Sequence, residues 1–445
     1  MTLPQLDEKR IQIKNKIIIG IDPANEKHQG YIIDEYGISI GKTFSFGNNH
    51  KGITTKLWYQ IKKRIEPDKI NPETLIFAIE ASLDFWQVLA AYLEGHGYRV
   101  ALVSPLTTKK TRALPGNDFS RTDPKDARLV AENTKEGFFH WYRHDTPREK
   151  AMKTLSLTYN KIRKDLQSNQ ARLRSQIKRI FPEFMQTVTL NTETALHLLS
   201  KYLYPEEYMN MDLESTTSEI RKISWRYTQT KLLELQTSAA NSIGIPKSIE
   251  EKIADKVTVT TLITLIKTLK QQQKTIKKEL VKMAKESPYF EIITSLDGIS
   301  DLTASLFLAE VVNPDKYDHF KQMQKLAGLN LRLNTSGKSR SYYKINKIGN
   351  SRLRWVVFQM TTETSKYIPE VRIKYLKRQL KQSSYTKNIT ACSAKLLQLL
   401  FCLMKNKQLY EYRAESQVLL VDLEEQYYRK TIKYKTKKSA EINYA

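Results

Sequence analysis

The sequence predicts an α/β domain followed by two mostly helical parts. From Lys16 to about Phe138, short runs rich in β-branched residues alternate with helical segments. From about Pro147 onward, long segments have a helical pattern, and a third part with further helical segments begins after Pro288. A chain of 445 residues usually forms two or three domains. We place an α/β domain at 1–145, a helical linker at 146–287, a C-terminal domain at 288–410 and a basic tail at 411–445.

The strands of the first domain are predicted in a definite order. Three come first, separated by glycine-containing turns, with the sequences IIIGID, GYIIDEYG and SIGKTFSF. A helix over residues 51–64 follows. The run TLIFAIEA is then a buried strand, DFWQVLAAYLEGHG a helix closed by Gly95 or Gly97, and RVALVSP a last strand. A meander followed by helix-linked strands is the order of an RNase H-like domain.

Carboxylates stand at the ends of two of these strands and on a later helix. Asp22 closes IIIGID, and Glu80 closes TLIFAIE. Asp123 and Asp126 lie three residues apart in RTDPKDARLVAENTK. A carboxylate that ends a strand lies at the edge of the sheet, and positions i and i+3 share one face of a helix. The four acids are therefore expected to converge.

Converging carboxylates repel one another, and divalent cations remove that cost. Mg²⁺ is the usual cation with oxygen ligands. We therefore interpret the four acids as the ligands of a two-metal nuclease-type site, although each acid alone would more often be a cap or a surface charge. We assign three neighbouring acids as caps or solvated residues: Asp84, Asp118 and Glu132.

The charge balance predicts a polyanionic partner. The 73 Lys and Arg exceed the 47 Asp and Glu, for a formal charge of +26. Such an excess favours nucleic acid, and a solvated surface that only aids solubility is the alternative. Residues 319–362 contain nine Lys or Arg and no Asp or Glu. The candidate phosphate contacts are basic residues of the helical linker and the C-terminal domain: Arg163, Lys164, Arg172, Arg174, Lys178, Lys338, Arg340, Lys344, Lys347, Arg352 and Arg354.

The remaining composition predicts a cytoplasmic location. Cys392 and Cys402 lie in an apolar helical context, which suggests buried thiols rather than a disulfide framework. The N-terminus lacks an apolar signal core, and no run approaches the length of a membrane span. The histidines show no HxxxH spacing, so no transition-metal site is indicated.

The helical linker contains an apolar repeat with alternate spacings of four and three residues. Such spacing is typical of the a/d seam of a coiled coil. With the helical segment before it, the repeat predicts an antiparallel arm or a dimer stalk, and a bundle within one domain is the alternative. No interpretation follows for residues 184–257. The positions of the repeat are Leu262, Ile266, Leu269, Gln273, Ile276, Leu280 and Met283.

Two segments of the C-terminal domain could contact phosphate. Gly298 in LDGISDLTASLFLAEV lies between two helical stretches and resembles half of a helix-hairpin-helix. The alternative is an ordinary helix start capped by Ser300 or Asp301. In NTSGKSRSYYK, Ser336 stands beside a glycine within a basic cluster. Neighbouring cations can assist a hydroxyl nucleophile, but such a loop more often only contacts phosphate.

Taken in order, these motifs resemble those of the DEDD transposases of the insertion sequence 110 group, also called bridge-RNA-guided recombinases. The segments GIDPANEKHQGYIID, FAIEAS and RTDPKDA are similar to the three acidic motifs of that family. The C-terminal segments LDGISDLTASLFLAEV, KLAGLN, TSGKSRS and KINKIGNSRLRW follow its second block. The resemblance extends over nearly the whole chain.

The resemblance implies a mechanism. Asp22, Glu80, Asp123 and Asp126 would bind two Mg²⁺ ions, for which Mn²⁺ can substitute. Ser336 would form a phosphoserine link to DNA, and the motif alignment favours it over two nearby serines, Ser339 and Ser341. A structured bridge RNA would pair with target and donor DNA. A dimer would assemble into a tetramer.

Two other classes of function use the same residues differently. A hydrolytic nuclease of the Holliday-junction-resolvase type would use the acids and a metal-bound water, without the serine. A nucleic-acid packaging or RNA-binding protein would keep the acids for structural reasons only. The RNA-guided recombinase is the leading interpretation.

Overall fold

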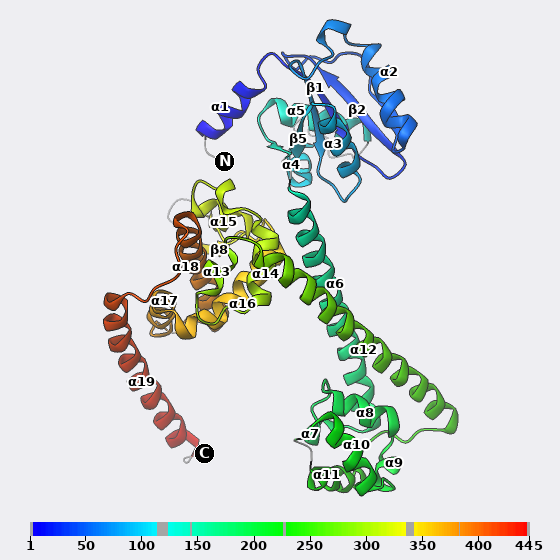
Figure 1. Cartoon of the computed structure of the whole chain (residues 1–445), viewed down its shortest axis with the longest axis vertical. Coiled ribbons are helices and arrows are strands. Elements are labelled where there is room, and N and C mark those ends of the chain that lie inside the picture. Colours follow the sequence, from blue (N-terminus) through cyan, green and yellow to red (C-terminus); the bar gives the residue numbers. More distant parts are fainter. Residues whose placement is uncertain are drawn as a thin grey trace. The chain divides into compact units, whose positions relative to one another are not determined.

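The structure is a computed structural model that describes residues 3–113, 123–142, 145–225, 228–334, 342–381 and 383–442. The chain divides into two compact units, Met1–His144 and Asp145–Ala445. The first unit is built on a six-stranded sheet, and the second is mostly helical (Figure 1). The predicted fold class is confirmed.

The sheet of the first unit has the order β3-β2-β1-β4-β5-β6. The first three strands form an antiparallel meander, β4 and β5 continue parallel to β1, and β6 pairs antiparallel to β5. This is the RNase H-like order that the sequence predicts, with the short strand β6 added. The strands are β1 (Ile17–Asp22), β2 (Lys27–Ile33), β3 (Phe44–Gly47), β4 (Leu75–Glu80), β5 (Arg99–Val103) and β6 (His140–Trp141).

Helices cover both faces of this sheet. On one face, side chains of α2 and α3 share a core with Phe77 of β4. On the other face, Val130 of α5 shares a core with Ile18 and Ile76. The helix expected over 51–64 begins as a π-helical turn, Gly52–Lys56, before α2. The helices of this unit are α1 (Leu3–Gln12), α2 (Leu57–Lys62), α3 (Trp86–Gly95), α4 (Pro105–Thr111) and α5 (Asp123–Lys135), with a 3₁₀ turn at Pro67–Lys69.

Helix α5 approaches β1 very closely at Gly20. A Cβ atom at Gly20 would meet the carbonyl oxygen of Ala127 and would lie 2.6 Å from the amide nitrogen of Ala131. Real Cβ contacts are never this short, so only glycine fits here without a shift of the helix. Gly20 thus sets the height of α5 above the sheet.

The second unit begins with two long antiparallel helices, α6 (Pro147–Ile180) and α12 (Ile249–Lys285). Arg148 at the start of α6 donates a hydrogen bond of 3.1 Å to the carbonyl oxygen of Met283 near the end of α12. Leu173 of α6 shares a core with Ile266 of α12. Each position of the predicted apolar repeat is buried or half-buried. The pair therefore forms within one chain.

Between α6 and α12, the described residues form five short helices, in the region 184–257 for which no structure was predicted. They enclose their own core, in which Tyr208 is fully buried and its ring lies 5.3 Å from that of Phe181. This cluster also includes residues of α6 and α12, so the insert is packed onto the paired helices. The helices are α7 (Phe184–Thr187), α8 (Glu193–Lys201), α9 (Pro205–Met209), α10 (Leu213–Ile223) and α11 (Gln229–Ala240).

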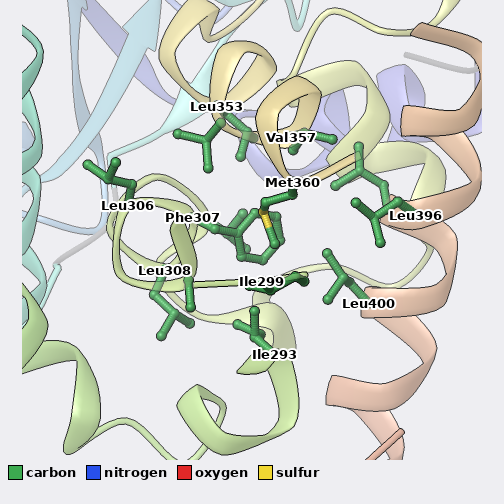
Figure 2. Close-up of a cluster of buried hydrophobic side chains, with 14 of the residues drawn as sticks. Ile293, Ile299, Leu306, Phe307, Leu308, Leu353, Val357, Met360, Leu396 and Leu400 are labelled. Atoms are coloured by element: carbon green, nitrogen blue, oxygen red, sulfur yellow. The ribbon is translucent and has the colours of Figure 1, made fainter. Parts of the chain in front are cut away.

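The C-terminal part packs around a second large core. Figure 2 shows Phe307 of α14, Met360 of α16 and Leu396 of α18 within this core. Tyr159 of α6 and Leu280 of α12 belong to the same cluster, so the paired helices are anchored in it. The elements are α13 (Phe290–Thr294), α14 (Asp301–Val311), a 3₁₀ turn (Pro314–Lys316), α15 (Phe320–Leu326), β7 (Leu331–Asn334), β8 (Tyr342–Ile345), α16 (Ser351–Tyr367), α17 (Pro369–Gln379), α18 (Tyr385–Asn406) and α19 (Ala414–Ile442).

Two details differ from the sequence-based expectations. The segment expected to be a basic tail forms helix α19, because Leu423 is buried and Glu424 pairs with Arg372 of α17 at 3.2 Å. Both cysteines are free, but only Cys392 is buried, which raises the pKa of its thiol to about 11; Cys402 is exposed. Within the described segments, no helix has the length and apolar character needed to cross a membrane.

The contact at Gly20 makes a first prediction. Gly20→Ala should lower the free energy of unfolding of the first unit by about 1–3 kcal/mol, because α5 must move off the sheet. Gly95→Ala is the matched control, since a Cβ there has no atom within 4 Å and alanine favours the helix. Denaturant unfolding of the two variants measures the difference. Equal stabilities would contradict the packing described here.

Candidate functional site

Asp22 and Glu80 end two neighbouring parallel strands. Strands β1 and β4 are paired in register up to Ile21 opposite Ile79, so the next residues, Asp22 and Glu80, lie side by side at one edge of the sheet. Side chains alternate between the two faces of a strand. Because Ile18 of β1 shares a core with α5, Asp22 four residues later is on the same face, and Glu80 is too. Glu80 is only 8% exposed.

Helix α5 brings a third acid to this face. Asp126 is 2% exposed and immediately precedes Ala127, the residue that contacts Gly20. The close approach of α5 therefore holds Asp126 near the strands that end in Asp22 and Glu80. Asp123 is the first residue of α5, and its side chain lies outside the described part of the structure.

The Asp126 carboxylate is bound by an arginine that sequence reasoning missed. Arg112 donates from Nε to Oδ1 at 3.1 Å, and from one Nη to Oδ1 and Oδ2 at 2.9 and 3.0 Å. This is a bidentate, charge-assisted contact. Arg112 follows α4 and lies 14 residues before Asp126, so no helical spacing links the two residues. Only the fold brings them together.

The other acids of this unit have local partners. Asp84 accepts a hydrogen bond of 3.0 Å from the Gln87 amide, and Glu132 pairs with Arg128 at 2.6 Å. These contacts agree with their assignment as capping or solvated residues, whereas Asp118 falls outside the described residues. Among the side chains that the structure describes, which do not include Asp123, no three His, Cys, Asp or Glu form a cluster ready to hold a metal ion.

The candidate nucleophile belongs to a segment between two paired strands. Strands β7 and β8 are antiparallel, from Leu331 opposite Ile345 to Asn334 opposite Tyr342. The intervening residues 335–341 lie outside the described residues, as does the side chain of Lys344. The predicted positions in this segment are Ser336, Lys338, Ser339, Arg340 and Ser341.

The residues after β8 are held by a buried carboxylate. Glu310 of α14 is 5% exposed and accepts hydrogen bonds from Ser156 at 2.8 Å and from Asn350 at 2.5 Å. Arg352 adds a two-pronged ion pair to Glu310, at 2.8 and 3.1 Å. Asn350 also caps α16. One carboxylate therefore joins α6, α14 and the start of α16.

Two predicted phosphate contacts are thus engaged within the protein. Besides the pairing of Arg352, Arg354 donates to the carbonyl oxygens of Ala327 and Lys347, at 3.0 and 3.2 Å. Lys347 itself is exposed. The two arginines stabilise the turn that follows β8, which is a structural role that the sequence alone did not indicate.

The turn between α13 and α14 is an ordinary capped helix start. Gly298 has a φ of +93°, and Ser300 caps α14 by accepting a hydrogen bond from the amide of Thr303. The amide of Ile299 donates to the Leu296 carbonyl, and the amide of Ser300 donates to the Thr303 hydroxyl. These amides are therefore already bonded inside the protein. The cap at Ser300 is therefore confirmed, and the resemblance to half of a helix-hairpin-helix stays a prediction.

The paired helices expose most of the predicted basic residues. The guanidinium of Arg163 is the exception, because it lies over the Trp355 ring at 4.2 Å. The other four predicted basic residues of α6 are exposed: Lys164, Arg172, Arg174 and Lys178.

A second basic cluster was not predicted. Lys374 and Arg378 lie one turn apart on α17, and Lys395 lies on the neighbouring helix α18. Burial lowers the pKa of Lys374, and the charges of Arg378 and Lys395 lower it further. Residues 371–410 contain nine Lys or Arg and no Asp or Glu. The absence of Asp and Glu from residues 371–410 is the feature of the sequence from which this basic cluster could have been predicted.

Comparison with known families gives two matches. A family model described as a transposase, of the DEDD type of the IS110 group, matches residues 19–182. A model described as the transposase IS116/IS110/IS902 family matches residues 290–376. The first match contains the four predicted acids, and the second contains Ser336. Among curated proteins, none matches the chain closely.

The buried Glu310 makes a second prediction. Arg352→Met should lower the free energy of unfolding of the second unit by about 3 kcal/mol or more, because a buried carboxylate loses its counter-charge. Adding Glu310→Gln should restore part of the loss, since a neutral amide tolerates burial better. Arg332→Met, an exposed residue of β7, is the control. Unfolding is measured without nucleic acid, and unchanged stability of Arg352→Met would instead favour a phosphate-binding role.

Proposed function

We propose that this chain, which belongs to the IS110 family of DEDD transposases, cuts and rejoins DNA strands with a two-metal site and a serine nucleophile. The observation that supports this most strongly is the placement of Asp22, Glu80 and Asp126 on one face of an RNase H-like sheet. These residue types suit the chemistry, because carboxylate oxygens are the ligands that Mg²⁺ prefers.

The acids would hold two divalent cations, Mg²⁺ or Mn²⁺, with Asp123 as the fourth ligand. Such cations supply Lewis-acid stabilisation to a phosphoryl group and its leaving oxygen. The fold of the chain places the acidic side chains that would hold these cations. Strands β1 and β4 fix Asp22 and Glu80 side by side, and α5 fixes Asp126 above them.

Ser336 is the proposed nucleophile, on the strength of its motif within the second family match. Its oxygen would replace one sugar oxygen on phosphorus, so that a phosphoserine bond forms and a DNA hydroxyl is released. Attack by a DNA hydroxyl on this phosphoserine would then rejoin the strands and release the serine. The ion pair of Glu310 with Arg352 supports the frame from which β7 and β8 present the segment.

The basic surfaces support binding of long nucleic acids. We propose that α6 and the C-terminal part contact target DNA, donor DNA and a structured guide RNA, mainly through phosphates. The RNA would choose the sites by base pairing. We further propose that the paired helices help a dimer to assemble into a tetramer, and that the protein acts in the cytoplasm of a prokaryotic cell.

Hydrolysis of DNA junctions is the second candidate function. One observation favours hydrolysis. The acids Asp22, Glu80 and Asp126 all lie within the unit Met1–His144, so a metal-dependent hydrolysis there would need no residue of the second unit. The two functions differ in the reaction intermediate. Only the recombinase forms a covalent bond between protein and DNA.

An SDS-quenched reaction separates the two functions. Purified protein is mixed with the RNA encoded beside its gene, supercoiled target and donor DNA, and Mg²⁺. We expect a covalent protein–DNA adduct that is lost in both Ser336→Ala and Asp22→Asn. Ser339→Ala is the matched control and should keep the adduct. Cleavage without an adduct, unchanged in Ser336→Ala, would establish hydrolysis instead.

The cluster on α17 and α18 makes a further prediction about nucleic-acid affinity. Lys374→Ala and Lys395→Ala should each reduce the slope of log affinity against log salt by about 0.7–0.9, as expected when one phosphate contact is lost. Lys377→Ala, an exposed lysine of α17, is the control and should leave the slope closer to that of the parent. Binding of duplex DNA and of the guide RNA is measured separately by fluorescence anisotropy. Unchanged slopes with both ligands would exclude the cluster as a phosphate site.

A further inference from the structure

We propose that Arg112 competes with divalent cations for Asp126, so that Asp126 becomes a full metal ligand only when this guanidinium moves away. Arg112 is then a positioning residue that holds the carboxylate before a metal arrives. The inference rests on the proposed metal site. The inference adds the Arg112 guanidinium to that site as a positive charge supplied by the protein itself.

The contact satisfies the charge of a deeply buried acid. The Asp126 side chain is 3% exposed, and that of Arg112 is 16% exposed. A carboxylate so far from water requires a counter-charge, and arginine stays protonated throughout the physiological pH range. Arg112 therefore supplies in the folded chain the positive charge that a metal ion would supply in a loaded site.

The geometry of the contact limits how a metal could bind. Arg112 donates to both oxygens of Asp126, at 2.9 to 3.1 Å. Mg²⁺ binds carboxylate oxygens at about 2.0–2.1 Å and tolerates little departure from octahedral geometry. A guanidinium across both oxygens blocks the direction from which one cation could take both. Its charge also repels any cation nearby.

The surrounding contacts allow the side chain to move while the backbone stays in place. Thr111, the last residue of α4, accepts a hydrogen bond of 2.9 Å from the Asn133 amide of α5. This bond ties the end of α4 to α5, so Arg112 begins from a fixed point. Rotation of the Arg112 side chain would then break the contacts between its guanidinium and Asp126. The freed guanidinium would remain near the site as a cation for a phosphate.

Calorimetric titration of the full chain with Mg²⁺, and separately with Mn²⁺, tests the proposal without nucleic acid. We expect Arg112→Gln to bind the cation at least about tenfold more tightly than the parent, because a nearby positive charge is removed. Arg112→Lys keeps the positive charge but loses the bidentate guanidinium contact, so its affinity for the cation should lie between those of the parent and Arg112→Gln. Arg128→Gln is the matched control, since Arg128 is exposed and pairs with Glu132 on the same helix.

Thermal unfolding supplies a second readout. Arg112→Gln should unfold at a lower temperature than the parent without metal and should gain more from added Mg²⁺. If Arg112→Gln proves unfolded without metal, Arg112→Lys provides the same comparison. If Arg128→Gln increases the affinity for Mg²⁺ as much as Arg112→Gln does, the proposal is overturned, because the effect would then come from net charge alone.

The outcomes distinguish this inference from the metal site on which it rests. If the parent binds Mg²⁺ and Asp22→Asn does not, the metal site stands. Affinity in the Arg112 variants equal to or weaker than that of the parent would then show that Arg112 merely supports the site. If neither the parent nor any Arg112 variant binds Mg²⁺ or Mn²⁺, the metal site itself is wrong, and the inference fails with it.

Discussion

The first unit depends on the contact between α5 and β1 at Gly20. Side chains normally separate the backbone of a helix from the sheet on which it packs. At Gly20 there is no side chain, and the backbone of α5 at Ala127 descends onto the strand. The acid that precedes Ala127 is thereby carried down beside the strand ends. The contact therefore brings Asp126 to the face of the sheet on which Asp22 and Glu80 lie.

Each of the two units contains a buried carboxylate whose charge must be balanced. Asp126 in the first unit and Glu310 in the second are both buried carboxylates, and each is paired with an arginine fork. Glu310 is held by more than its arginine. Glu310 also accepts from Ser156 and Asn350, in a network that ties three helices together. Such a network keeps Glu310 paired with Arg352, whereas we propose that a divalent cation can replace Arg112 at Asp126.

Much of the fold was predictable, because local pattern determines it. The run IIIGID and the run LIFAIE each end in an acid, and parallel pairing then places those acids side by side. The placement of Asp123 and Asp126 on one later helix was also predicted, and both residues belong to α5. The pairing of Arg112 with Asp126 could not be predicted, since Arg112 follows α4, Asp126 lies on α5, and the two residues are 14 apart in sequence. Spacing predicts contacts along one element, but contacts between elements depend on how those elements pack.

Charge was predictable in sum but not in detail. The net charge of +26 predicts a polyanionic partner, yet it does not say which cations face outward. Arg352 and Arg354 occur in a strongly basic segment and are nevertheless bound by the protein's own carboxylate and carbonyl groups. Lys374 was overlooked, although burial beside two other cations lowers its pKa. A cation without an acidic neighbour is stabilised when an anion binds, so the absence of Asp and Glu from residues 371–410 is a stronger reason to propose a phosphate site there than the number of lysines alone.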